Sequence, residues 1–125
     1  MNKEKSYIWI TTQKEGYHYW DGAKDNVQFL KNIHRHIFNF RVDIEVKHNE
    51  REIEFFTFKK FINEGINEVW RKYNLDFCDE NNKGCSCETI SDGLYSIINK
   101  WYKDRDVIIE ISEDKENGSR KIYSI

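Results

Sequence analysis

The stretch Ile33–Lys47, with the sequence IHRHIFNFRVDIEVK, decides the expected fold. Its even-numbered positions from His34 to Val46 are histidine or apolar residues, whereas most of its odd-numbered positions are polar. Successive side chains of a β-strand point to opposite faces, so this alternation predicts one long strand with one buried face. A turn at 48–51 then leads into Glu52–Phe56, which is predicted to be a shorter partner strand that completes a hairpin.

Two helices are predicted after this hairpin. From Phe58 to Tyr73 the apolar residues recur at the spacing of one helix face, and Thr57 suits the N-cap. Ser86 is placed to cap a second helix, whose last apolar position is Trp101. The polar segment between the two helices is predicted to be a loop.

The remaining strands lie on either side of this central part. The expected class is α+β, with an antiparallel four-stranded sheet and two helices on one face. Residues 1–125 are expected to form a single domain. A long open sheet edge favours pairing with another subunit in a homo-oligomer. The further strands and turn are predicted at Tyr7–Thr12 with a continuation at Tyr17–Trp20, at Val107–Ile111, at the turn Glu113–Gly118, and at Lys121–Ile125.

The composition narrows the class of function. Aromatic residues make up 15% of the 125 residues, which argues against a disordered chain because they bury much area. The net charge of -2 argues against a protein dedicated to duplex nucleic acid. No stretch approaches the roughly 18 apolar residues of a membrane span.

The opening stretch and the cysteines indicate a reducing compartment. Met1–Lys5 does not open an apolar leader segment of the kind expected for secretion. The number of cysteines is odd, namely Cys78, Cys85 and Cys87. We therefore expect reduced thiols in a cytoplasm. Cys-x-Cys brings two thiolates together for zinc, but a structural site needs four ligands, so idle thiols are the interpretation adopted.

Three histidines form a candidate metal site. His34 and His36 lie two residues apart on the long strand and point to one face, and with His18 they make the three-ligand set of a catalytic zinc ion. The alternative is that they pack at the wet end of a buried face. His-x-His is weak evidence, so no metal or other cofactor is assigned, and the sequence leaves both possibilities open.

The order of these segments resembles the 6-pyruvoyl- and 6-carboxy-tetrahydropterin synthase family. The resemblance implies a tunnelling fold, in which subunits join their sheets into a barrel and bind ligands between them. It also implies zinc on the three histidines and a late glutamate that anchors the heterocycle. The matching segments are Tyr17-His18, His34–Phe38, Arg51–Phe55 followed by Phe58-Lys59, Leu75-Asp76-Phe77, Cys87–Ile90 and Ile109–Glu113.

Two departures argue against synthase activity. Leu30 stands where that family has its catalytic cysteine, and Phe77 replaces the histidine of its Asp-His pair. Neither side chain transfers protons near neutral pH, so we expect no enzyme activity. A tetrahydropterin synthase-like zinc enzyme is the alternative.

A closer resemblance is to the phage Thoeris anti-defence proteins of the sponge type. It rests on the segments His34–Val42, Arg51–Phe55, Phe58-Lys59 and Ile111–Asp114, followed by Glu116–Gly118. The resemblance implies that the protein binds cyclic ADP-ribose signals (gcADPR) made by TIR-domain proteins without cleaving them, in the cytoplasm of an infected bacterial host. It also implies a dimer or hexamer, with cyclic di- or trinucleotides as further ligands. A phage module that binds a host protein is a third hypothesis.

The candidate site residues follow from the chemistry of such a ligand, which carries an adenine and a pyrophosphate. The base needs a flat partner, and the charge needs guanidinium or N–H donors. The alternatives are core packing for the aromatic residues, surface salt bridges for the arginines and an exposed turn for the glutamate. The candidates are Phe77, Trp20 and Tyr19 for stacking, Arg105 and Arg120 for the pyrophosphate, Arg51 for a second site, Ser86 and Cys87 for backbone N–H groups, and Glu113 for the adenine amino group.

Overall fold

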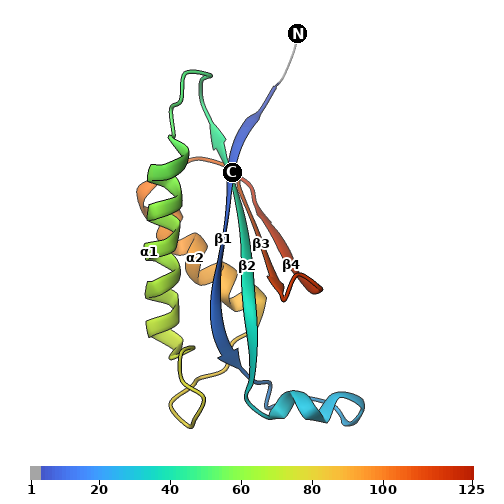
Figure 1. The fold of residues 1–125 in the computed structure, drawn as a ribbon. Coiled ribbons are helices and arrows are strands. Elements are labelled where there is room, and N and C mark those ends of the chain that lie inside the picture. Colours follow the sequence, from blue (N-terminus) through green and yellow to red (C-terminus); the bar gives the residue numbers. More distant parts are fainter. Residues whose placement is uncertain (1–3) are drawn as a thin grey trace.

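The protein folds as an α+β structure with one sheet and one layer of helices (Figure 1). The structure is a computed structural model that describes residues 4–125, so Met1–Lys5 lies only partly within it. The four strands are antiparallel and follow the order β1-β2-β3-β4. The elements are β1 (Ser6–His18), the 3-10 helix η1 (Asp25–Lys31), β2 (His34–Val46), α1 (Phe55–Tyr73), α2 (Cys87–Trp101), β3 (Val107–Glu113) and β4 (Asn117–Tyr123). The expected class and the four-stranded sheet are confirmed.

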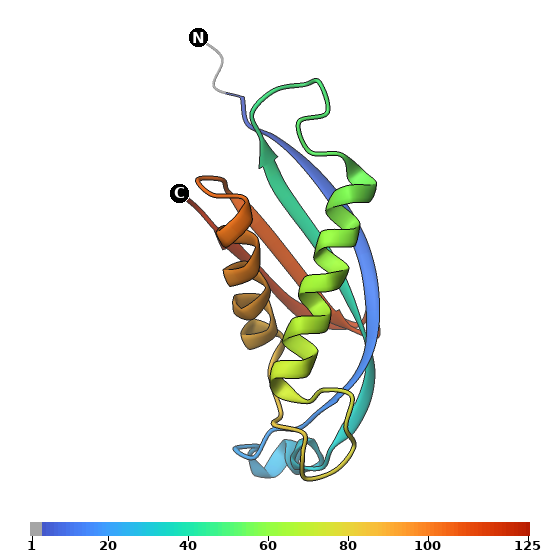
Figure 2. The ribbon, with the colours of Figure 1, turned by 90° about the vertical axis from the view of Figure 1, so that its left-hand side faces the viewer.

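The long strand β2 lies at the centre of the fold, as its alternation predicted. It pairs with β1 along its whole length and with β3 from Phe38 to Ile44. Phe38, Phe40, Val42 and Ile44 are almost completely buried on the helix side of the sheet. Helices α1 and α2 both cover this face (Figure 2). The pleat of β2 therefore separates the core from the outer face.

Helix α1 begins earlier than predicted, and the expected strand Glu52–Phe56 is wrong. The Glu54 side chain accepts hydrogen bonds from the backbone N–H groups of Phe56 and Thr57, so Glu54 and not Thr57 is the N-cap. A carboxylate in this position satisfies N–H groups that have no partner within the helix. Residues 48–54 therefore form a loop, and Phe55 and Phe56 belong to the first turn of α1.

The C-terminal hairpin is longer than the sequence indicated. Its loop spans 114–116, where Asp114 and Lys115 adopt positive φ angles of 57° and 62°. The predicted turn Glu113–Gly118 therefore contains the end of β3 and the start of β4, and β4 ends at Tyr123. This strand is hard to recognise because it lies at the edge of the sheet and most of its residues are polar.

The connections between these elements differ in how far they could be predicted. Ser86 caps α2 as expected, since its side chain accepts a hydrogen bond from Thr89 N at 3.1 Å. Strand β1 runs without a break through Gly16 to His18, so the expected gap within it is absent. The 3-10 helix η1 was not predicted, and it buries none of its residues. Within residues 4–125, no helix has the length and apolarity to cross a bilayer.

Candidate functional site

Three histidine side chains meet where β1 ends and β2 begins. His18 and His34 are the last paired residues of the two strands, and His36 points to the same face of β2. Their potential ligand nitrogen atoms all lie within 4.8 Å of one another. The imidazole rings meet edge to face, with centroids 4.6 Å to 5.1 Å apart. Strand pairing thus brings together residues that are sixteen or more positions apart in the chain.

Each histidine is held through its Nδ1 atom. The acceptors are the Cys85 carbonyl for His18 at 2.7 Å, the Asn32 carbonyl for His34 at 2.8 Å and the Asp114 carboxylate for His36 at 2.7 Å. A carbonyl or carboxylate oxygen can only accept a hydrogen bond, so Nδ1 donates in all three rings. Nδ1 bonding of this kind is usual around protein-bound metals, because it leaves Nε2 to face the metal.

Glu113, at the end of β3, faces the histidines. Its Oε2 atom lies 3.0 Å from His18 Nε2, and its Oε1 atom lies 3.8 Å from His36 Nε2. Burial opposes a charge on His18, but its hydrogen bonds to Glu113 and to the Cys85 carbonyl outweigh burial and raise its pKa. The same contact with His18 lowers the pKa of Glu113. Burial is the main cause of the lowered pKa of His34.

These residues fit a metal ion. Zinc in proteins takes imidazole nitrogen and carboxylate oxygen ligands, and the three rings turn a nitrogen each towards one another and towards Glu113. The sequence left open whether the histidines bind a metal or only pack, and the orientation of the rings favours a metal. A metal ion here would supply a Lewis acid. Within the described part of the chain, the potential metal-ligating group contains these three histidines and none of the cysteines.

A cavity of about 580 Å³ opens beside the histidines. It lies between the end of β1, the start of α2 and the β3–β4 hairpin, and its volume is within the range of small-molecule sites. Five of the predicted site residues line it, together with Leu30. They are Tyr19, Trp20, Ser86, Cys87 and Glu113.

Trp20 presents the most accessible aromatic surface in the cavity. Its side chain is 49% exposed, and the backbone N–H of Trp20 donates to the Leu30 carbonyl at 2.7 Å. The indole lies over Gly22, where an added Cβ would come within 2.9 Å of Trp20 Nε1. A flat, partly open ring held in this way suits stacking against a base.

The thiols beside the cavity are not activated. Burial raises the pKa of Cys85 and of Cys87 to about 12, so both remain protonated at neutral pH. Leu30 lines the cavity and has no proton-transferring group. The described cavity lining therefore offers no ready thiolate nucleophile.

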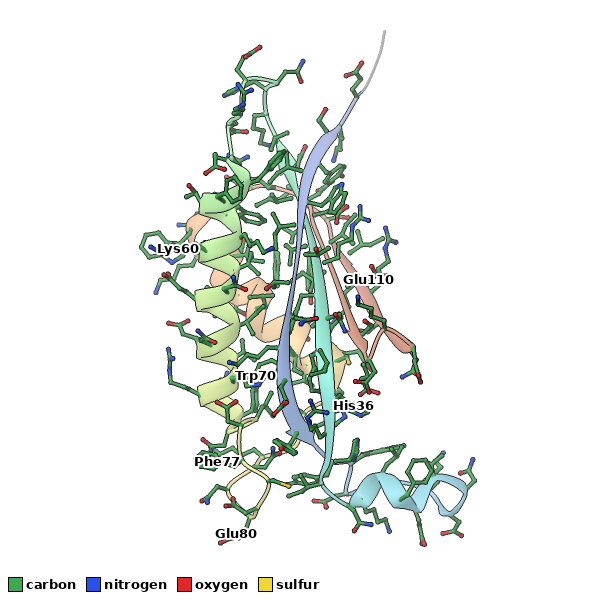
Figure 3. The ribbon with its side chains drawn as sticks, viewed as in Figure 1. His36, Lys60, Trp70, Phe77, Glu80 and Glu110 are labelled. Carbon is green, nitrogen blue, oxygen red and sulfur yellow. The ribbon has the colours of Figure 1, made fainter. Side chains whose placement is uncertain are left out.

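The other four predicted site residues lie elsewhere. Phe77 is in the loop after α1, apart from His36 (Figure 3). Arg105 is held by Glu52, with nitrogen–oxygen distances of 2.6 Å and 3.0 Å. Arg120 of β4 lies opposite Glu110 of β3 in the strand register, on the outer face of the sheet. Arg51 lies in the loop before α1. The structure therefore brings none of these four residues to the lining of the cavity.

The sequence did not assign a role to Asp114 or to Asn82. Asp114 binds both His36 Nδ1 and the Ile37 N–H, so it ties the hairpin loop to β2. Asn82 is buried and bonds the Tyr17 carbonyl, the Phe77 carbonyl and the Gly84 N–H, which holds the loop 74–84 against the end of β1. Asp114 and Asn82 follow or lie in turn-rich segments. This is the only feature of the neighbouring sequence that points to their structural roles.

The chain was compared with known proteins. No protein-family model matches it, and the comparison with curated proteins gives no match.

Proposed function

We propose that this protein binds and sequesters a small nucleotide signal of the cyclic ADP-ribose class without cleaving it. The observation that carries the proposal is the cavity beside the histidines, which combines an accessible tryptophan with protonated thiols. Such a site can hold a base but lacks an activated thiol to attack the ligand. The resemblance to phage Thoeris anti-defence proteins supports this choice and extends it to inhibition of Thoeris immunity in the host cytoplasm.

The cavity offers each part of the ligand a partner of suitable chemistry. Trp20 and Tyr19 provide flat surfaces for adenine, and Glu113 provides carboxylate acceptors. His18, with its raised pKa, and the N–H groups at the start of α2 favour a negative charge nearby. Nanomolar affinity corresponds to about -12 kcal/mol, and one stacked base contributes roughly 1–3 kcal/mol, so several such contacts must combine.

The proposal includes a homo-oligomer with the tunnelling-fold arrangement. The edge strands β1 and β4 each leave one side without a strand partner among the described residues. Open edges of this kind are often paired across subunits. Because the described cavity lining contains no arginine or lysine, a neighbouring subunit is the expected source of cations for the pyrophosphate, and a dimer or hexamer would provide it.

A capture-and-release experiment tests sequestration. The protein is incubated with cyclic ADP-ribose isomers, filtered, then heat-denatured, and the nucleotide is quantified by chromatography at each stage. We expect the nucleotide to leave the filtrate and to return intact after denaturation. Degraded nucleotide in the released fraction would disprove sequestration, and unchanged filtrate would exclude binding of that isomer. Parallel samples with cyclic di- and trinucleotides test the further ligands.

A zinc-dependent synthase is the second candidate, favoured by the orientation of the three histidines. Two features argue against synthase activity. Leu30 lines the cavity and Phe77 lies away from it, so neither residue supplies an acid or a base at the site. Turnover of dihydroneopterin triphosphate by zinc-loaded protein would establish this function. Stoichiometric zinc without turnover would exclude it and leave sequestration as the proposal.

A further inference from the structure

The Glu113 carboxylate faces the same space as the three Nε2 atoms. We propose that Glu113 is a fourth ligand to a metal ion held by His18, His34 and His36, so that the centre is closed by protein groups. This inference depends on metal binding by the histidines and not on the identity of the nucleotide. It differs from the heterocycle-anchoring role that the sequence suggested for Glu113.

The distances around Glu113 match those between two ligands of one ion. With metal–ligand bonds of about 2.1 Å and tetrahedral angles, two ligand atoms are separated by roughly 3.4 Å. The distances from Glu113 are 3.0 Å to His18 Nε2 and 3.8 Å to His36 Nε2. The first distance is to Oε2 and the second is to Oε1, and the group of ligand atoms within 4.8 Å contains the three histidines without Glu113. One carboxylate oxygen therefore has to shift towards the histidines when the ion binds.

The contacts of His18 support the same conclusion. Its Nδ1 atom faces the Cys85 carbonyl and its Nε2 atom faces the Glu113 carboxylate, so both ring nitrogens point at acceptors. A neutral ring has one N–H donor, and its other nitrogen would repel the second oxygen. A metal ion between His18 Nε2 and Glu113 would bind both groups, and it would also engage the Nε2 atoms of His34 and His36.

The surroundings hold the carboxylate in place. Glu113 is the last residue of β3, where it pairs with Phe38 on one side and with Asn117 on the other. Its Oε1 atom accepts a hydrogen bond from Asn117 Nδ2 at 3.2 Å, which leaves Oε2 directed at His18. A ligand fixed by two neighbouring strands loses little freedom when the ion binds.

A fourth protein ligand changes what the centre can do. Catalytic zinc sites keep one position open for water or substrate, whereas sites with four protein ligands are closed and structural. With Glu113 bound, the ion would hold β1, β2 and β3 together beside the cavity and would not activate water. The inference therefore assigns the ion a role in shaping the binding site.

Cobalt spectroscopy tests whether the coordination position is filled. Metal-free protein is loaded with Co²⁺, its visible absorption is recorded, and azide is added as a ligand for any open position. Glu113→Gln is the test variant because it keeps the shape but loses the charge. Glu88→Gln is the matched control, since Glu88 lines the same cavity, whereas the contacts with His18 and His36 are made by Glu113.

We expect the spectra of the wild type and of Glu88→Gln to be unchanged by azide, and the spectrum of Glu113→Gln to shift. Zn²⁺ affinity, from competition with a chromophoric chelator, should fall about 10- to 100-fold or more in Glu113→Gln, since even outer partners of metal ligands contribute that much. An azide-sensitive wild type would overturn the inference without the need for any variant. Failure of the wild type to bind Co²⁺ and Zn²⁺ would also overturn it, while nucleotide capture by the metal-free protein would still be measurable.

Discussion

The indole ring of Trp70 on α1 lies directly over Gly16 of β1. A Cβ added to Gly16 would come within 2.9 Å of Cζ2 and Nε1 of Trp70, and the same Nε1 donates to the Glu15 carbonyl at 2.9 Å. Gly16 also pairs with His36 across the sheet. The end of α1 is thus fastened to the strands that carry the histidines.

Replacing Gly16 by alanine should destabilise the protein. The added methyl group would push Trp70 away from β1, and overpacking of this kind costs about 1–3 kcal/mol. Urea unfolding at neutral pH measures this cost. The double variant Gly16→Ala/Trp70→Phe provides the control, because the smaller ring makes room for the methyl group. Simple addition of the two single effects in the double variant would contradict the proposed clash.

Trp20 and Phe77 make a matched pair for testing where the nucleotide binds. Their side chains are similarly exposed, at 49% and 46%, but only Trp20 lines the cavity. We expect Trp20→Ala to weaken binding of a captured cyclic ADP-ribose isomer by about 1–3 kcal/mol, the contribution of one stacked base. Phe77→Ala should leave the affinity unchanged in the same titration calorimetry. Equal losses in both variants would place the base elsewhere.

The ion pair between Glu52 and Arg105 should make stability depend on pH. These side chains are 20% and 15% exposed, and the hydrogen bond to Arg105 is the largest cause that lowers the pKa of Glu52 to about 2, from a usual value of 4.5. A lowered pKa means that the stabilisation is complete above about pH 4.5 and is lost as the pH falls towards 2.

The variant Glu52→Gln tests this dependence. At pH 7 it should lower the free energy of unfolding by about 2 kcal/mol, as expected for hydrogen bonds to charged groups. The difference from the wild type should shrink between pH 4.5 and 2. The pKa of Asp106 is also lowered to about 2, but Asp106 is present in both proteins and its effect cancels. A difference that stays constant over this range would rule out the ion pair as its cause.

Ser86 should matter for the start of α2, which borders the cavity. Ser86→Ala removes the acceptor of the Thr89 N–H and should cost about 1 kcal/mol of stability. Ser86→Asp keeps an acceptor at the same position and should stay close to the wild type. Thermal and urea unfolding of the three proteins compare them directly. Equal stability of Ser86→Ala and the wild type would show that the cap contributes nothing.

Local patterns in the sequence predicted much of the fold. The alternation from His34 to Val46 identified β2 and its buried face, and the apolar spacing identified both helices. The start of α1 was misplaced because Phe55 and Phe56 also suit a strand, and the choice depends on the Glu54 cap. The polar edge strand β4 was only partly found, because its pairing with β3 leaves little trace in its composition.

The candidate site was predictable only in part. Strand periodicity placed His34 and His36 on one face, His18 was the proposed third histidine, and the resemblance added Glu113; the structure brings these four residues together. The sequence could not show that Glu52 binds Arg105, because the two residues are 53 positions apart in the chain.

The sequence by itself determined the long strand, both α-helices and the face on which His34 and His36 lie, because helix and strand periodicity is a property of neighbouring residues. Only the tertiary structure decided which side chains share the site. The register of β1, β2 and β3 brings His18, His36 and Glu113 into contact, and it directs Arg120 to the opposite face. Such contacts depend on the pairing of strands far apart in the chain, and a one-residue change of register would turn every side chain of a strand to the other face.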